Sequence, residues 1–161
     1  SHESKIINRE VIIMATIHNE ITVNASLDKV WSTLADLALL DQYDPTVMKS
    51  TLLSTEKTGI GAKRKVMMKD GKNWFEEKIT IFKPNEALTY QLTDCSFPIK
   101  GLKHSYSFEK IGNQTKVIQV MEYTVKFGLL GKLLDRLMIR KQSDIGIKKF
   151  FTGLKSYAET H

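Results

Sequence analysis

The last stretch of the chain, residues 128–159, constrains the fold more than any other part of the sequence. Its apolar residues recur at the three- and four-residue spacing of an amphipathic helix. They are Leu130, Leu133, Leu134, Leu137, Met138, Ile147, Phe151, Leu154 and Ala158. The segments before it have the pattern of strands, apart from one helical region near residues 26–43. A wide apolar helix face that follows a run of strands has only the sheet to pack on, so the space between them is either core or pocket.

The preceding segments give the order of elements. Residues 16–24 alternate between apolar and polar side chains, which is typical of a half-buried strand. A helix is expected after Ser26, a favourable N-cap, with Val30, Trp31, Leu34 and Leu37 on its apolar side. A short helical turn follows at 39–43 and ends before Pro45. Six further strands are predicted at 47–54, 62–69, 72–82, 88–94, 102–111 and 114–126.

Length and composition fit this architecture. The 161 residues favour one domain, 16–161, preceded by an arm of residues 1–15 that is either loose or partly a cloning remnant. Cys95 is the single cysteine, so neither an intrachain disulfide nor a multi-cysteine zinc site can form. No apolar run approaches the ~18 residues of a membrane span, and we expect a cytoplasmic protein.

Asp70-Gly71 is a strong hairpin signal and sets the register of two strands. If these two residues form the loop, Lys69 faces Lys72. One face then pairs Val66 with Phe75, Arg64 with Glu77 and Ala62 with Ile79. The other face pairs Met67 with Trp74, Lys65 with Glu76 and Lys63 with Lys78. The first face is the more apolar and is assigned inward, where two charges must pair with each other or hold a polar ligand.

Gly112-Asn113 predicts a second hairpin in the same way. Its inner face pairs Phe108 with Val117, Tyr106 with Gln119, His104 with Met121 and Leu102 with Tyr123. The outer face pairs Glu109 with Lys116 and Lys103 with Glu122, as expected for ion pairs at the surface. The preceding strand, residues 88–94, adds Tyr90 to the inner face. Several polar side chains among apolar neighbours are typical of a pocket wall, whereas the alternative is a core whose tyrosine hydroxyls reach backbone carbonyls.

The order and spacing of several short segments resemble the START-like superfamily, also called SRPBCC, in its polyketide cyclase/dehydrase and lipid-transport branch. The matching segments are residues 21–31, 59–64, 70–71, 77–79, 106–108, 112–117 and 154–159, with Leu34, Asp36 and Pro84 between them. The resemblance implies the helix-grip fold, in which a curved seven-stranded antiparallel sheet wraps around a long C-terminal helix. It also implies a cavity for an apolar or amphipathic small molecule. Members of the superfamily do not share one reaction, and the resemblance transfers no catalytic residues.

Other kinds of chemistry have weaker support in the sequence. The histidines at 2, 18, 104 and 161 lack metal-ligand spacing, so no metal or other cofactor is expected. The Gly59-Ile60-Gly61 segment lacks the rest of a dinucleotide-binding loop and predicts a turn. The net charge of +6 and the basic side chains after residue 131 leave open a transient contact with an anionic membrane. The sequence lacks a regular alternation of aromatic and basic residues, so nucleic-acid binding is not expected.

The leading hypothesis is therefore a protein that binds or transports an apolar or amphipathic small molecule. Its predicted ligand-binding residues are Arg64, Val66, Phe75, Glu77, Ile79, Tyr90, His104, Tyr106, Gln119, Met121, Tyr123, Leu134, Leu137, Met138 and Phe151. One alternative is a cofactor-independent cyclase or dehydratase, with Glu77 and His104 as acid–base candidates supported by Arg64 and Tyr106. Another is a protein-interaction domain. The ligand and the oligomeric state are not determined by the sequence.

Overall fold

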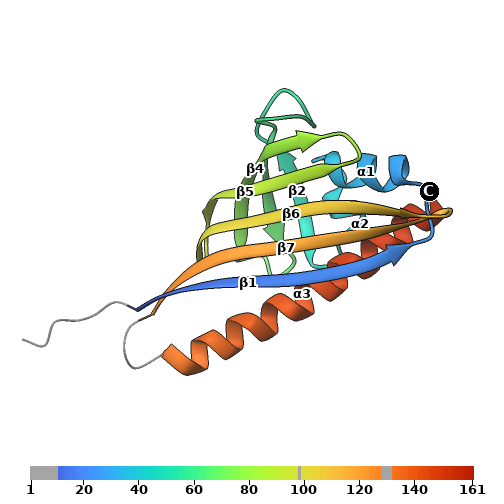
Figure 1. Ribbon diagram of the computed structural model, residues 1–161. Helices are drawn as coiled ribbons and strands as arrows, with labels where there is room; N and C mark the ends of the chain where they lie inside the picture. The colour runs from blue at the N-terminus through green and yellow to red at the C-terminus, as the bar shows by residue number, and fades with distance from the viewer. Residues whose placement is uncertain (1–10, 98, 128–131) are drawn as a thin grey trace, which may run out of the picture.

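The computed structural model describes residues 11–97, 99–127 and 132–161, and only the backbone of 11–13, 125–127 and 132–139. The strands are β1 (Val11–Val23), β2 (Val47–Leu52), β3 (Lys63–Met68), β4 (Trp74–Lys83), β5 (Ala87–Cys95), β6 (Ile99–Ile111) and β7 (Gln114–Phe127). They form one antiparallel sheet in the order β1-β7-β6-β5-β4-β3-β2. The helices are α1 (Leu27–Ala35), α2 (Leu40–Tyr43) and α3 (Lys132–Thr160). Figure 1 shows the curved sheet wrapping over α3, which confirms the predicted helix-grip architecture.

The helices form where the sequence predicts them and bury the predicted residues. In α1, the Ser26 hydroxyl accepts a hydrogen bond from the Lys29 N–H at 3.3 Å, which caps the first turn. In the described half of α3, Ile147, Phe151, Leu154 and Ala158 are all buried. The predicted stripe residues Leu130, Leu133, Leu134, Leu137 and Met138 lie outside the residues whose side chains the structure describes.

The first predicted hairpin register is confirmed between β3 and β4. Val66 faces Phe75, Arg64 faces Glu77 and Lys65 faces Glu76. The loop itself is longer than the predicted two residues, because the Met68 N–H donates to the Asn73 carbonyl at 2.9 Å. Within this loop Gly71 has a φ of +71°, and the Asp70 carboxylate accepts from the backbone N–H groups of Lys72 and Asn73. Symmetric lengthening of the loop preserves the register.

The second hairpin is confirmed over most of its length but not at its open end. His104 faces Met121, Tyr106 faces Gln119 and Phe108 faces Val117. The predicted one-to-one pair of Leu102 with Tyr123 is not formed, because the register shifts between Lys100 and Lys103 and leaves both Gly101 and Leu102 opposite Tyr123. Gly101 has a φ of +66° at this point, the left-handed conformation in which glycine begins a β-bulge. The bulge inserts an extra residue in β6.

The N-terminal strand begins earlier than predicted. We expected it at residue 16, after a loose arm, but β1 begins at Val11 and pairs with β7 from that residue onward. Residues 11–15 therefore belong to the sheet rather than to the arm. The sequence signal was missing because Val11, Ile12 and Ile13 are all apolar, so the alternation that marks a half-buried strand is absent.

Helix α3 is held against α2 by a close backbone contact at Gly153. A Cβ atom placed on Gly153 would lie 1.8 Å from the Tyr43 carbonyl oxygen and 3.1 Å from Cδ of Pro45. Only glycine lets the two helices approach this closely. The other helical glycine, Gly146, has no neighbour within 4 Å of the equivalent position. The close approach is thus specific to Gly153, and the neighbour is α2.

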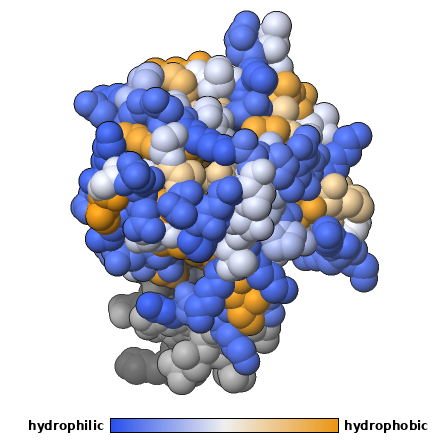
Figure 2. Space-filling model, turned by 90° about the vertical axis from the view of Figure 1, so that its right-hand side faces the viewer, coloured by the Kyte–Doolittle hydropathy of each residue, from blue (hydrophilic) through white to orange (hydrophobic). Residues whose placement is uncertain are grey.

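The exposed surface carries apolar side chains singly or in small groups. Large apolar residues that are exposed include Met14, Met48, Leu53, Ile60, Ile81, Ile111 and Ile145. On the face shown in Figure 2, apolar residues form separate patches among hydrophilic ones. None of the helices in the described part of the chain combines the length and apolarity that crossing a membrane requires.

Candidate functional site

The inner face of the sheet brings together the side chains that the sequence placed there. Ten predicted residues are buried: Arg64, Val66, Glu77, Ile79, Tyr90, Tyr106, Gln119, Met121, Tyr123 and Phe151. Two more, Phe75 and His104, are half-buried. The remaining three, Leu134, Leu137 and Met138, lie outside the described side chains. The inner face reaches α3 through aromatic contacts, since the ring centroids of Tyr106 and Phe150 are 6.2 Å apart.

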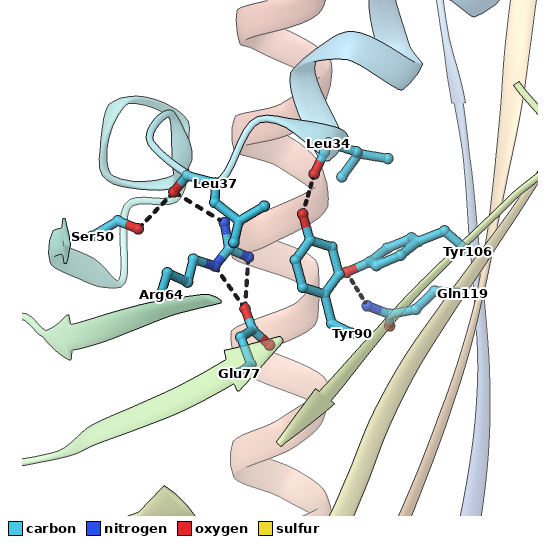
Figure 3. Close-up of polar contacts among 8 residues, drawn as sticks. All are labelled: Leu34, Leu37, Ser50, Arg64, Glu77, Tyr90, Tyr106 and Gln119. Carbon is cyan, nitrogen blue, oxygen red and sulfur yellow. Dashed lines mark hydrogen bonds and ion pairs between the residues drawn. The ribbon is translucent and has the colours of Figure 1, made fainter. Parts of the chain in front are cut away.

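Arg64 and Glu77 form a buried ion pair across β3 and β4. Nε of Arg64 donates to Oε1 of Glu77 at 2.8 Å, and Nη2 lies 2.6 Å from the same oxygen (Figure 3). Each side chain is only 5% exposed. Burial alone would lower the pKa of Arg64, but the Glu77 carboxylate, together with Tyr90 and Tyr43, more than offsets this effect, so the pKa is raised. The guanidinium therefore stays charged, and the pair has to be treated as two buried ions.

The backbone between α1 and α2 completes the surroundings of the guanidinium. Nη1 of Arg64 donates to the Leu37 carbonyl at 3.4 Å, and the Ser50 hydroxyl donates to the same oxygen at 2.8 Å. The guanidinium carbon lies 4.7 Å from the centroid of the Tyr90 ring, in a cation–π contact. Sequence reasoning missed the contribution of Leu37, because a backbone carbonyl at the end of a helix leaves no pattern in the residue types.

Tyr90 and Tyr106 differ in how their hydroxyl groups are used. Tyr90 donates to the Leu34 carbonyl at 2.5 Å, which matches the interpretation of a core tyrosine that reaches a backbone carbonyl. The Tyr106 hydroxyl accepts from the Gln119 amide at 2.9 Å, and the Gln119 carbonyl accepts from Asn19 at 3.4 Å. Burial raises the pKa of both tyrosines, so both are neutral at pH 7.

His104 lies on the same face, opposite Tyr90 on one side and Met121 on the other. Burial lowers the pKa of His104, an effect that the negative charge of Glu77 opposes and that the positive charge of Arg64 reinforces. The imidazole is therefore neutral at pH 7. In the described part of the chain its ring nitrogens make no hydrogen bond, whereas those of His161 do.

One carboxylate oxygen of Glu77 also lacks a partner. Both contacts from Arg64 go to Oε1, and Oε2 makes no hydrogen bond within the described residues. Among these residues, every side-chain nitrogen or oxygen that is fully enclosed has a hydrogen-bond partner. Oε2 is therefore not fully enclosed: it borders space that a molecule the size of water can enter. Glu77 is nevertheless only 4% exposed, so access to this oxygen is narrow.

Tyr43 is a residue of this site that sequence reasoning missed. Tyr43 is 6% exposed, and its ring centroid lies 5.9 Å from that of Phe150 and 5.8 Å from that of Tyr157. Its hydroxyl group also interacts electrostatically with Arg64. The sequence placed it only in a short helical turn before Pro45. The position of α2 against α3, which brings Tyr43 to the site, depends on the Gly153 contact and leaves no local signal.

The arrangement supports binding and proton transfer better than metal chemistry. The described residues contain no cluster of histidine, cysteine and carboxylate side chains that could hold a metal ion. Cys95 is half-buried, and its thiol donates to the carbonyls of Phe97 and Ile99. The inner face offers a neutral imidazole and a carboxylate oxygen that has no partner among the described residues.

Comparison with known proteins agrees with this architecture. Residues 14–159 match the family model described as polyketide cyclase/dehydrase and lipid transport. The search of curated proteins gave no significant match. The fold is similar to three solved structures that cover most of the chain.

The Zhui aromatase/cyclase from Streptomyces sp. R1128 has a TM-score of 0.77 and 16% identity, over 91% of this chain and 94% of that one. TTHA0849 from Thermus thermophilus has a TM-score of 0.75 and 17% identity, over 89% and 97%. Ara h 8.0201 has a TM-score of 0.72 and 15% identity, over 92% and 99%. At such identities the structures show a common fold, whereas the family model matches nearly the whole sequence. The chain therefore belongs to the polyketide cyclase/dehydrase and lipid transport family.

Proposed function

We propose that this protein binds an apolar or amphipathic small molecule between the inner face of the sheet and α3. The observation that carries the proposal is Oε2 of the buried Glu77, which has no hydrogen-bond partner among the described residues. Around it lie aromatic and aliphatic side chains with few polar groups, the composition typical of small-molecule sites. The family description, which includes both lipid transport and cyclase chemistry, supports the same role.

The proposal is tested with N-phenyl-1-naphthylamine, a neutral apolar dye whose fluorescence rises in an apolar site. We expect saturable binding with one dye molecule per chain. Replacing His104 with tryptophan should weaken dye binding by at least about tenfold, because the larger side chain occupies the binding space. The variant should still fold, because the half-buried imidazole has no hydrogen bond to lose among the described residues.

The matched control is Lys103→Trp, which changes the preceding, exposed residue of β6. Its side chain points to the opposite face of the sheet, so dye binding should stay within about twofold of the native protein. Thermal unfolding of both variants shows whether they remain folded. Binding that is absent, or that falls equally in the two variants, would contradict the proposal. Native mass spectrometry of the purified protein then identifies any bound molecule.

Acid–base catalysis on the bound molecule is a second candidate. It is favoured by the neutral His104 and the unpartnered Glu77 oxygen, which lie on the same inner face and interact electrostatically. If the molecule recovered from the protein is a carbonyl compound that it converts, His104→Gln should reduce turnover by about 10²-fold or more while binding changes only a few-fold. Turnover that survives this substitution would exclude His104 as the acid–base group.

A further inference from the structure

The Arg64–Glu77 pair is unusual in using only one carboxylate oxygen. An arginine that meets a carboxylate side by side makes two parallel hydrogen bonds, one to each oxygen. Here Nε and Nη2 both approach Oε1, at 2.8 and 2.6 Å, while Nη1 turns to the Leu37 carbonyl. Figure 3 shows the second carboxylate oxygen directed away from the guanidinium group. The pair therefore neutralises its charge and, among the described residues, leaves one strong hydrogen-bond acceptor unused.

The charges around this acceptor determine what it can bind. Among the buried polar residues that the structure describes, Arg64 is the one cation: the others are Thr33, Asp44, Glu77, Thr89, Thr115 and Gln119. Its charge is already balanced by Glu77, and His104 is neutral at pH 7. A ligand carboxylate or phosphate at Oε2 would meet a like charge, with no unpaired cation among the buried residues that the structure describes, in surroundings where such repulsion is weakly screened.

A neutral donor has the opposite balance. A hydroxyl group that donates to a buried carboxylate makes a charge-assisted hydrogen bond, which is stronger than a bond between neutral groups. It also satisfies an acceptor that is otherwise almost without access to water, since the Glu77 side chain is only 5% exposed.

We propose that Glu77 selects the ligand by its hydroxyl group: the site takes neutral hydroxylated apolar molecules, such as phenols or alcohols, in preference to lipid carboxylates. This inference rests on the proposed function and adds the chemical class of the ligand. The hydroxyl hydrogen donates to Oε2 of Glu77, while Arg64 holds Oε1 and keeps the carboxylate oriented. The apolar part of the ligand lies against the aromatic and aliphatic side chains of the inner face.

Three naphthalenes of nearly equal size test this preference: 2-naphthol, 2-methoxynaphthalene and 2-naphthoate. Each competes at pH 7 with N-phenyl-1-naphthylamine for the native protein. The first has a hydroxyl donor, the second has an ether in its place, and the third is an anion. We expect 2-naphthol to bind at least about tenfold more tightly than the ether, the difference typical of a hydrogen bond to a charged group. The anion should bind most weakly.

A double variant, Arg64→Met with Glu77→Leu, tests whether the preference comes from this pair. It removes both charges together, so that neither is left buried alone. We expect the ratio between the affinities for 2-naphthol and for the ether to fall to about one in this variant.

The preference is overturned if the native protein binds the ether as tightly as 2-naphthol, or binds 2-naphthoate most tightly. It is also overturned if a folded double variant keeps the native ratio. The comparison on the native protein is decisive even if the double variant does not fold. If neither the dye nor any naphthalene binds, the proposed function fails and the preference fails with it. Dye binding without discrimination leaves the proposed function intact and overturns the preference alone.

Discussion

At the scale of single residues, the buried pair of Arg64 and Glu77 joins stability to function. Both side chains are 5% exposed and each is the partner of the other. Replacing one of them leaves a buried charge without its counter-ion, which costs far more than the pair contributes over an apolar replacement. The pair is thus costly to break and inexpensive to remove as a unit.

Arg64→Met is accordingly expected to lower the free energy of unfolding by about 3–5 kcal/mol, because it strands the Glu77 carboxylate. Chemical denaturation monitored by fluorescence or circular dichroism measures the change. The double variant Arg64→Met with Glu77→Leu is the control and should recover most of this loss. A single variant as stable as the native protein would mean that the Glu77 carboxylate reaches water when Arg64 is absent.

The sequence predicted these residues better than it predicted their contacts. The hairpin register placed Arg64 opposite Glu77, because a turn of known size fixes every pair behind it. It did not predict which oxygen of Glu77 is used, since that depends on the Leu37 carbonyl drawing Nη1 away. Leu37 is 27 residues from Arg64 and acts through its backbone. Such contacts depend on tertiary packing and have no signature in residue type.

At the scale of elements, the contact between α2 and α3 determines how the helix meets the rest of the molecule. Gly153 allows the Tyr43 carbonyl to approach the α3 backbone, and Tyr43 in turn packs against Phe150 and Tyr157. Glycine costs a helix about 1 kcal/mol relative to alanine, and the contact with Tyr43 gives a structural reason for that cost at Gly153. The sequence could not indicate this neighbour, since the position of α2 follows from the whole sheet.

Alanine at the two helical glycines should have opposite effects on stability. Gly153→Ala brings a methyl group within 1.8 Å of the Tyr43 carbonyl, so α2 and α3 have to separate. We expect a loss of about 1–3 kcal/mol in the free energy of unfolding, as for overpacked cores. Gly146→Ala meets no atom within 4 Å and should stabilise the protein by up to about 1 kcal/mol. Equal effects in a denaturation experiment would show that the contact does not constrain α3.

At the scale of the whole molecule, the order of strands makes the fold dependent on distant parts of the chain. β1 pairs with β7 along its whole length, although about a hundred residues separate them. The hydrophobic periodicity predicted the strands and the long helix because each is a local pattern. The extension of β1 to Val11 and the bulge at Gly101 were missed because both depend on the partner strand. The architecture was therefore predictable, while local irregularities required the assembled sheet.

The Gly153 contact also has a mechanical consequence. A helix seated against a neighbouring backbone at one glycine cannot slide along its own axis, because the next residue to reach that point would carry a side chain. On the face of α3 that carries Gly153, those residues are Lys149, Phe150, Ser156 and Tyr157. The contact at Gly153 therefore fixes the position of α3 along its own axis, and with it the positions of all the side chains that α3 presents to the sheet.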